Sequence, residues 1–275
     1  MNDSNSIKVA IIDMNMGFPN QGMRGIQEIL HQYKTDNHLN LTIDIFDIRQ
    51  KGEVPDLSYN IYISSGGPGN PYDGEGLQWE SSFFNLLDQI DNFNLISDEK
   101  KYAFLICHSF QLGCRKYQLG EVTQRKSNAF GIFPISLTAE GEKEPIFNGL
   151  NNPFFSVDSR DWQVIQPNRK AFEKIGAKLL AIEKDRPHVD LERCMMAIRF
   201  SPYVIGTQFH PEADPTGMKI YLLQEEKKEA IIKNHGEDKY YDMLNSLENP
   251  DRIMLTKGVI LPNFLDEAIH ALQFA

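Results

Sequence analysis

The chain of 275 residues carries 28 Lys and Arg side chains against 38 Asp and Glu, a formal net charge of −10. This excess of negative charge disfavours binding to nucleic-acid phosphates, and no apolar run approaches the roughly 20 residues that span a bilayer. The N-terminus lacks the basic start and apolar stretch of a secretory signal, so a cytoplasmic protein without nucleic-acid or membrane partners is expected.

Strand-like and helix-like segments alternate in the first half of the chain. Short runs rich in β-branched and apolar residues predict strands over residues 7–14, 41–48, 59–64 and 102–106. The second run alternates in polarity, as a strand near a sheet edge does. Helical spacing of apolar residues after the first and third strands predicts two helices. This order favours an α/β fold with an open, mostly parallel sheet flanked by helices, of the flavodoxin-like kind.

The second half divides into a β-rich stretch and a helical tail. Apolar runs at strand spacing over about residues 127–208 predict an antiparallel extension at the sheet edge. The remainder has helical patterns and no residues that suggest chemistry. We therefore expect an α/β domain over residues 1–212 and a helical C-terminal extension over residues 213–275, packed on that domain.

Capping residues predict the helices of this tail. Thr216 is expected to cap a helix that runs to about Lys233 and ends at Gly236. Pro250 and Pro262 each follow a residue that favours a helix start, so each is expected to lie in the first turn of a further helix.

Three cysteines, Cys107, Cys114 and Cys194, are too few for a disulfide framework, and none forms a CxxC pair, so neither a metal nor a cofactor is expected. Cys107 directly follows the strand over residues 102–106, and a helical pattern begins after it. A cysteine at such a junction lies over a helix N-terminus, where free N–H groups and the helix dipole favour a thiolate. Most free cysteines are core residues, so this segment alone favours a structural role.

Two further strand ends carry residues suited to the same chemistry. His210 and Glu212 stand two residues apart, so in extended backbone both point to one side, where the carboxylate could orient an imidazole that deprotonates a thiol. The loop SGGPG at residues 65–69 brings glycine N–H groups that could face a developing oxyanion. Because ligands gather at the carboxyl ends of strands in open α/β sheets, a catalytic triad of Cys107, His210 and Glu212 becomes the stronger interpretation.

In this order, the three segments resemble class I glutamine amidotransferases. That family has an SGGPG-type loop, a G-x-C-x-G-x-Q turn and a Q-F-H-P-E segment, which match residues 65–69, 107–111 and 208–212 here. The likeness extends over about residues 7–212, and it is nearest to the amidotransferase domains of GMP synthase type.

The resemblance implies a role for each matching residue. Cys107 would attack the side-chain amide of glutamine, His210 would accept and deliver the proton, and Glu212 would hold the imidazole in its tautomer. The backbone N–H groups of Gly67 and His108 would form the oxyanion hole. A glutamyl-thioester would then be hydrolysed to glutamate, with ammonia passing to a separate synthetase or acceptor.

Substrate recognition is expected from residues around this triad. The resemblance implies that Gln111 and Gly66 help to position glutamine. The family often has a Ser-His-Gly-Asp-like stretch where this chain has Asp158-Ser159-Arg160-Asp161, so Ser159 and Arg160 are the candidates for binding the amino-acid end. Arg160 could pair with an anionic group of the substrate, and an ordinary loop arginine is the equal alternative. A homodimer is left open.

Two departures from the family pattern keep other functions open. The glycines that flank the family nucleophile are Leu105 and Ser109 here, and such glycines allow a tight turn. Homoserine acyltransferases also combine a cysteine, a His-Pro-Glu segment and a substrate-binding arginine, and their turn lacks the first glycine. An acyltransferase, a γ-glutamyl hydrolase and a noncatalytic binding module are therefore the alternatives to a glutaminase.

Overall fold

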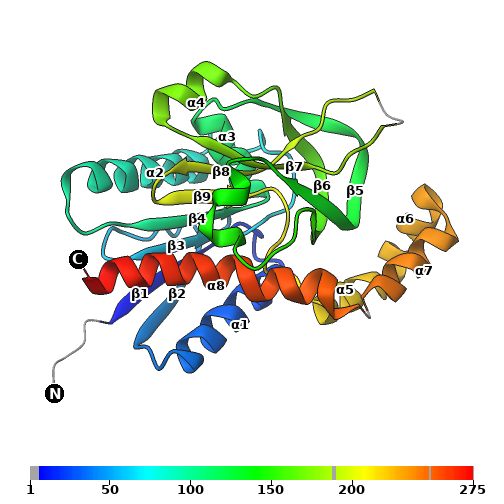
Figure 1. Ribbon diagram of the computed structural model, residues 1–275, viewed down its shortest axis with the longest axis horizontal. Helices are drawn as coiled ribbons and strands as arrows, with labels where there is room; N and C mark the ends of the chain where they lie inside the picture. The colour runs from blue at the N-terminus through cyan, green and yellow to red at the C-terminus, as the bar shows by residue number, and fades with distance from the viewer. Residues whose placement is uncertain (1–5, 188–189, 248, 275) are drawn as a thin grey trace.

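One curled sheet organises the molecule (Figure 1). The computed structural model describes residues 6–187, 190–247 and 249–274. Within these ranges the strands form a single sheet in the order β2-β1-β3-β4-β9-β8-β7-β5-β6. The strands are β1 (Ile7–Asp13), β2 (Leu41–Asp47), β3 (Ile61–Ser64), β4 (Tyr102–Ile106), β5 (Glu121–Leu137), β6 (Phe154–Ile165), β7 (Lys178–Glu183), β8 (Met195–Ser201) and β9 (Val204–Thr207).

The sheet has a parallel half and an antiparallel half. β1 pairs in parallel with β2 and β3, and β4 pairs in parallel with β3 and β9, so the carboxyl ends of these strands lie along one edge. Antiparallel pairing then continues the sheet through β8, β7, β5 and β6. The predicted fold class is confirmed, and β2 lies at the sheet edge, as the alternating pattern of residues 41–48 predicted.

Helices cover both faces of the parallel half. Ile26 of α1 and Leu261 of α8 pack in one core cluster with Ile63 of β3, whereas Phe83 of α2 packs on the opposite face with Tyr62. Neighbouring residues of a strand point to opposite faces, which explains this division. The helices are α1 (Gln21–Asp36), α2 (Gln78–Ile96), α3 (His108–Lys116), α4 (Arg169–Ile175), α5 (Pro215–Leu222), α6 (Glu225–His235), α7 (Glu237–Ser246) and α8 (Pro250–Phe274), with short 3-10 turns at Gly141–Lys143 and Pro145–Phe147.

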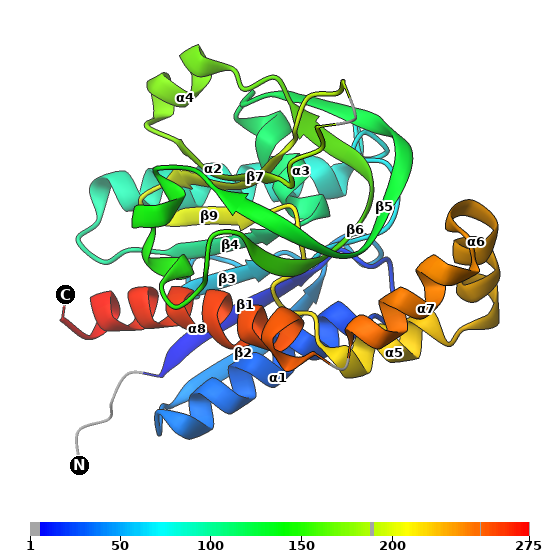
Figure 2. The same ribbon diagram turned by 45° about the vertical axis from the view of Figure 1, so that its right-hand side comes forward.

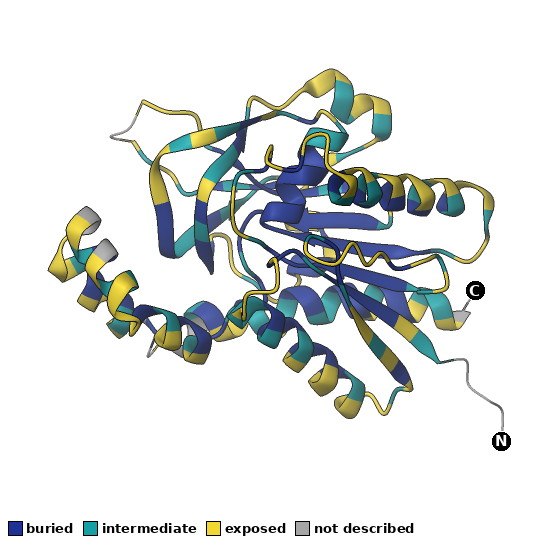
Figure 3. Ribbon diagram, turned by 180° about the vertical axis from the view of Figure 1, so that it is seen from behind, coloured by how far each residue is buried: buried dark blue, intermediate teal, exposed yellow. Residues whose placement is uncertain are grey.

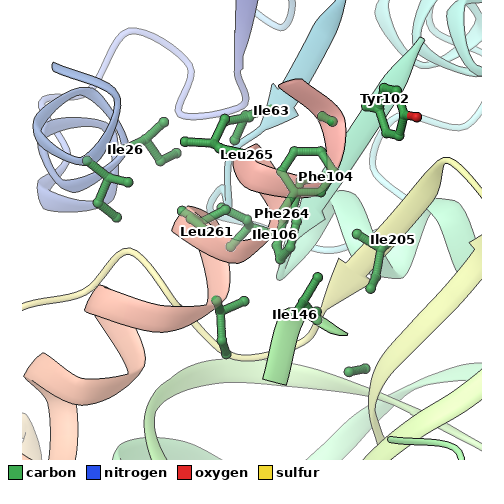
Figure 4. Packing of buried hydrophobic residues seen from close by; sticks show 14 of the residues in the cluster. Ile26, Ile63, Tyr102, Phe104, Ile106, Ile146, Ile205, Leu261, Phe264 and Leu265 are labelled. Carbon is green, nitrogen blue, oxygen red and sulfur yellow. The ribbon is translucent and has the colours of Figure 1, made fainter. Parts of the chain in front are cut away.

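The last helix, α8, is part of the main core. Its Phe264 ring meets the Phe104 ring of β4 edge-on, with ring centroids 5.2 Å apart (Figure 4). The core therefore crosses the expected boundary between residues 1–212 and 213–275. Pro250 begins α8 as predicted, but the helix start predicted at Pro262 is wrong because Pro262 lies inside α8. Core packing of the neighbouring turns outweighs the roughly 3 kcal/mol that an interior proline costs.

The helices between Glu212 and α8 extend from the side of α1 past β5 and β6 (Figure 2), and their buried side chains form a cluster with Phe130 of β5 and Val157 of β6. Asp214, not Thr216, caps the first of them: its side chain accepts the N–H of Gly217 at 2.6 Å, and Pro215 follows at the first helical position. Aspartate followed by proline is the stronger start signal. The single helix predicted from Thr216 is divided in two: α5 ends at Leu222, and α6 ends at His235, where Gly236 is the C-cap, close to the predicted end.

The break between α5 and α6 has a packing reason. It lets Leu222 and Ile231 both pack against Phe130 of β5 and Val157 of β6, in a small cluster separate from the main core. The strands β3, β4 and β9 are buried throughout, whereas α6 and α7 carry many exposed residues (Figure 3). None of the helices in the described ranges is long and apolar enough to cross a membrane.

Candidate active site

Cys107 forms a strained turn at the carboxyl end of β4. The strand ends at Ile106, α3 begins at His108, and Cys107 between them has φ 49° and ψ −98°. Its N–H donates to the carbonyl of Thr207 at 2.7 Å, which fixes the turn to the end of β9. A residue other than glycine with positive φ is uncommon and is often found at functional sites. At this turn the Cys107 side chain reaches the cavity at the carboxyl edge of the sheet.

Leu105, which replaces a family glycine, is accommodated by two glycines elsewhere. It pairs with Gly206 of β9, where an added Cβ would lie 3.0 Å from the Leu105 Cβ. In α3, a Cβ added to Gly113 would lie 2.9 Å from Leu105 Cδ1. The space that the family provides at position 105 is therefore provided by the neighbouring strand and helix.

Ser109, at the second departure, joins α3 to the end of β3. Its hydroxyl donates to the carbonyl of Ser65 at 2.7 Å and lies 2.7 Å from the hydroxyl of Ser64. Because the Ser109 proton is used by Ser65, the Ser64 hydroxyl is the donor in the second bond. Two buried hydrogen bonds thus hold the start of α3 beside the glycine-rich loop, so the turn tolerates serine there.

His210 and Glu212 form the second part of the site. The Nδ1 atom of His210 lies 2.8 Å from Oε1 of Glu212, which leaves Nε2 free for a proton acceptor or donor. Backbone pairing with β6 holds the histidine, because its N–H donates to the carbonyl of Val157 at 2.9 Å. Burial alone would lower the pKa of His210, but Glu212 and Cys107 raise it well above its ordinary value. The carboxylate and the sulfur therefore favour the charged form of the imidazole, against the effect of burial.

Gly66 lies where these two parts meet. A Cβ added there would be 2.9 Å from Cε1 of His210 and 3.4 Å from the Cβ of Cys107. Only a glycine leaves room for both side chains at this distance. The three strand ends that the sequence analysis grouped are therefore brought together.

Glu212 is fixed from the side of α1. Its side chain is 1% exposed, and a Cβ added to Gly25 of α1 would lie 2.3 Å from the Glu212 carbonyl oxygen. Close contact with α1 therefore depends on glycine. Two residues after Glu212, Asp214 binds Arg24 of α1 at 2.7 Å and Lys257 of α8 at 2.7 Å. This junction of three helices holds the carboxylate behind the histidine.

Gln208 is a site residue that the sequence analysis did not single out. Its Nε2 lies 3.7 Å from Sγ of Cys107, and its Oε1 accepts a hydrogen bond from Nε2 of Gln111 at 3.1 Å. Gln111 also donates to the carbonyl of Trp162 at 3.3 Å. The Gln111 amide thus orients the Gln208 amide so that its NH₂ faces the sulfur. The Q-F-H-P-E match was the available signal, since Gln208 begins it.

Arg160 has a place that the sequence analysis did not foresee. Its guanidinium points into the interior, where Nε binds Asp158 at 2.7 Å and Nη2 lies 3.0 Å from Sγ of Cys194. Nη1 donates to the carbonyl of Trp162, and Glu183 lies 3.6 Å from Nη2. Arg160 contributes to the cavity wall, but its side chain is only 1% exposed and its guanidinium is bound to these interior groups rather than turned toward a substrate anion. Ser159 lies closer to the thiol: its carbonyl is 3.9 Å from Sγ of Cys107.

A cavity of about 470 Å³ lies over Cys107. Residues from the loops after β1 and β3, from β6 and from the tail helices line it, among them Asn15, Gly67, His108, Ser159, Tyr221 and Lys227. His108 is the first residue of α3, so its N–H has no partner within the helix and is free to face the cavity.

The neighbouring residues limit the chemistry available. The His108 ring is buried, and burial, with Arg49 and Arg115, lowers its pKa to about 3, so it stays neutral and is no second base. Cys114 lies inside α3, fully buried, and burial raises its pKa. In the ranges that the structure describes, no three His, Cys, Asp or Glu side chains gather to hold a metal ion. The arrangement suits covalent attack by one thiol.

Comparison with solved structures places the fold. A glutamine amidotransferase from Thermotoga maritima has a TM-score of 0.69 and 17% identity, covering 96% of this chain and 98% of that one. The glutamine amidotransferase from Methylobacillus flagellatus has a TM-score of 0.66 and 14% identity, covering 98% and 96%. The glutaminase domain of Trypanosoma brucei CTPS, with bound acivicin, has a TM-score of 0.56 and 11% identity, covering 90% and 97%.

Sequence comparison identifies the family. No curated protein sequence matches the chain. The family model described as glutamine amidotransferase class-I matches residues 23–230, well over half of the chain, and this match includes Cys107, His210 and Glu212. The chain belongs to the class I glutamine amidotransferase family.

Proposed function

We propose that the protein is a glutaminase in which Cys107, His210 and Glu212 hydrolyse the side-chain amide of glutamine. The observation that carries the proposal is the strained Cys107 turn beside the hydrogen-bonded pair of His210 and Glu212, with both parts in contact across Gly66. Family membership supports amide hydrolysis as the class of reaction.

The proposed reaction has two covalent steps. The Cys107 sulfur attacks the amide carbon, the carbonyl electrons move to oxygen, and the N–H groups of Gly67 and His108 bind the oxyanion. When the carbonyl re-forms, the C–N bond breaks and the imidazolium of His210 gives its proton to the departing ammonia. A water molecule, deprotonated by His210, then attacks the glutamyl-thioester, so glutamate leaves and the sulfur is restored.

Glu212 and the two glutamines would assist this sequence. The Glu212 carboxylate stabilises the charged imidazole and fixes its tautomer. We assign Gln208 to orienting the Cys107 sulfur through its amide N–H, with Gln111 holding Gln208 in place. Gln111 would therefore act on the sulfur through Gln208, in addition to any contact with glutamine.

The ammonia acceptor is proposed to lie on a separate synthetase, as in a GMP synthase-type system. Membership of the class I family supports this pairing, because amidotransferases of this family often pair with a synthetase partner. We place the reaction in the cytoplasm, where thiols stay reduced, in keeping with three cysteines that are all unpaired.

A glutamate-release assay tests this proposal. Wild-type protein should convert glutamine to equal amounts of glutamate and ammonia, and Cys107→Ala should lower the rate at least about 10³-fold. Cys114→Ala is the matched control, because Cys114 lies in α3, the helix directly after Cys107, but in the core. Thiol release from an acyl-CoA in the presence of homoserine would point to an acyltransferase instead. If the wild type and Cys107→Ala both bound glutamine and neither hydrolysed it, the protein would be a binding module.

A further inference from the structure

If the cavity binds a free amino acid, the substrate needs a cationic partner, and the guanidinium of Arg160 is already bound in the interior. A free amino acid such as glutamine carries an α-carboxylate, and burying that charge without a partner is unfavourable. The donors of Arg160 are used by Asp158, Trp162, Cys194 and Met196 in the interior. Among the cavity-lining residues, the other Lys or Arg side chain is Lys227, from α6.

Lys227 is held at the cavity wall by a stack of rings. Its Nζ lies 5.4 Å from the ring centroid of Tyr221, which also lines the cavity. The Tyr221 ring in turn lies against that of Phe130 from β5, with centroids 4.9 Å apart and planes 33° apart. Leu222 and Ile231, on either side of Lys227 in the chain, are buried against Phe130 and Val157. The position of the ammonium group is therefore set by packing with the antiparallel half.

Within the described ranges, no carboxylate forms an ion pair with Lys227, although acidic side chains are abundant. Lys257 illustrates the usual situation, since it binds both Glu28 and Asp214. Lys227 is half-buried, so part of its hydration is already lost. An anion entering the cavity would restore the missing interaction.

We propose that Lys227 binds the α-carboxylate of the amino-acid substrate whose side-chain amide meets Cys107. This inference rests on the proposed function and adds a residue that determines specificity. It also gives α6 a role: the helix brings a substrate-binding group to a site built mainly by the sheet. Lys227 would then select amides that carry a carboxylate at the far end over neutral amides of the same length.

The test compares glutamine with its α-carboxamide, glutaminamide, on three variants. Lys227→Gln should lower kcat/KM for glutamine about 10- to 100-fold, mainly through KM, and leave the value for glutaminamide nearly unchanged. Lys227→Arg should keep most of the preference for glutamine. Lys228→Gln is the matched control, because its ammonium lies 5.8 Å from the Tyr240 ring, toward α7. It should behave as wild type with both substrates.

A second readout does not depend on turnover. Acivicin, an amino-acid electrophile, should alkylate Cys107 more slowly in Lys227→Gln than in wild type, whereas neutral iodoacetamide should react equally with both. An equal decrease in kcat/KM for glutamine and glutaminamide in Lys227→Gln, or an unchanged rate of acivicin labelling, would overturn the assignment of Lys227. The proposed glutaminase function would not be affected by either result. A wild-type protein inert toward both glutamine and acivicin would overturn the proposed function, and this inference with it.

Discussion

Two polar clusters built by the same sheet differ in whether their hydrogen-bonding groups are used. Around Arg160, the side chains of Asp158, Glu183 and Cys194 are bound to arginines in the interior. Around Cys107, the oriented imidazole and the start of α3 open onto a cavity. The first cluster joins β6 to β7 and β8 where the sheet curls, so its charges stabilise the fold. The second retains free groups for a substrate. Whether a charged residue near the site can bind substrate therefore depends on whether its hydrogen-bonding groups already have partners within the protein.

The comparison predicts opposite effects for two buried glutamates. Glu212→Gln should lower kcat about 10²- to 10⁴-fold, because the imidazole loses its orienting carboxylate. It should also lower the pKa of His210, since burial is then less opposed. The proton donor to ammonia is thus lost earlier as pH rises, and the alkaline limb of the kcat/KM profile moves to lower pH. An unchanged alkaline limb would contradict this role.

The control for that variant is Glu183→Gln, which should keep its hydrolysis rate and lose stability. Burial alone would raise the pKa of Glu183, but Arg125, Arg160 and Arg186 lower it below its ordinary value. Glu183 therefore stabilises the fold above its unfolded-state pKa, and this contribution is lost as pH falls through the folded-state pKa. Urea unfolding of the wild type and Glu183→Gln at several pH values should show that the variant lacks this pH-dependent part of the free energy of unfolding.

Arg160→Met should destabilise the fold by about 3–5 kcal/mol, because Asp158 would keep a buried charge without its partner. Activity of the folded fraction should change little. Urea unfolding and steady-state kinetics on the same preparation measure both quantities. A stable variant with KM for glutamine raised tenfold or more would show that Arg160 binds substrate, as the sequence suggested.

Gln208→Leu should have a smaller effect, about three- to tenfold on kcat, with KM nearly unchanged, because one weak hydrogen bond to sulfur is removed. Gln163→Leu is a suitable control, since the Gln163 amide binds Arg125 and not the thiol. An increase in KM alone would mean that Gln208 contacts glutamine instead of the sulfur.

Ser109→Ala should lower the free energy of unfolding by about 1–2 kcal/mol, since it removes two buried hydrogen bonds and leaves the Ser64 hydroxyl with fewer partners. The glutaminase rate of the folded protein should change less than in Glu212→Gln or Gln208→Leu. Thermal unfolding measures the first effect. Full stability in Ser109→Ala would mean that the hydroxyl does not hold α3.

The parts of the site that lie at strand ends were predictable. Cys107, His210 and Glu212 each follow a buried run, and parallel strands bring such ends to one edge by geometry alone. Arg160 was different, because the face to which a strand residue points depends on register and on the curl of the extension. β5 also shifts register between Gln124 and Ala129, which local sequence does not specify.

Tertiary packing also explains the errors in the tail. Pro262 follows a pattern typical of a helix start, but α8 continues through it because its flanking residues are buried against the sheet. The return of α6 to the cavity, which brings Lys227 to the site, depends on the contact between Leu222 and the antiparallel half. Nothing in the local sequence of the tail indicates that contact.

Alkylation by acivicin, mapped by peptide mass spectrometry, tests the central claim most directly. Near neutral pH the label should appear on Cys107, with one label per chain, and glutamine should protect against it. Cys114 and Cys194 should stay unmodified, because both are fully buried and burial raises the pKa of each, that of Cys194 to about 11. An unlabelled Cys107, or equal labelling of Cys114, would contradict its assignment as the nucleophile.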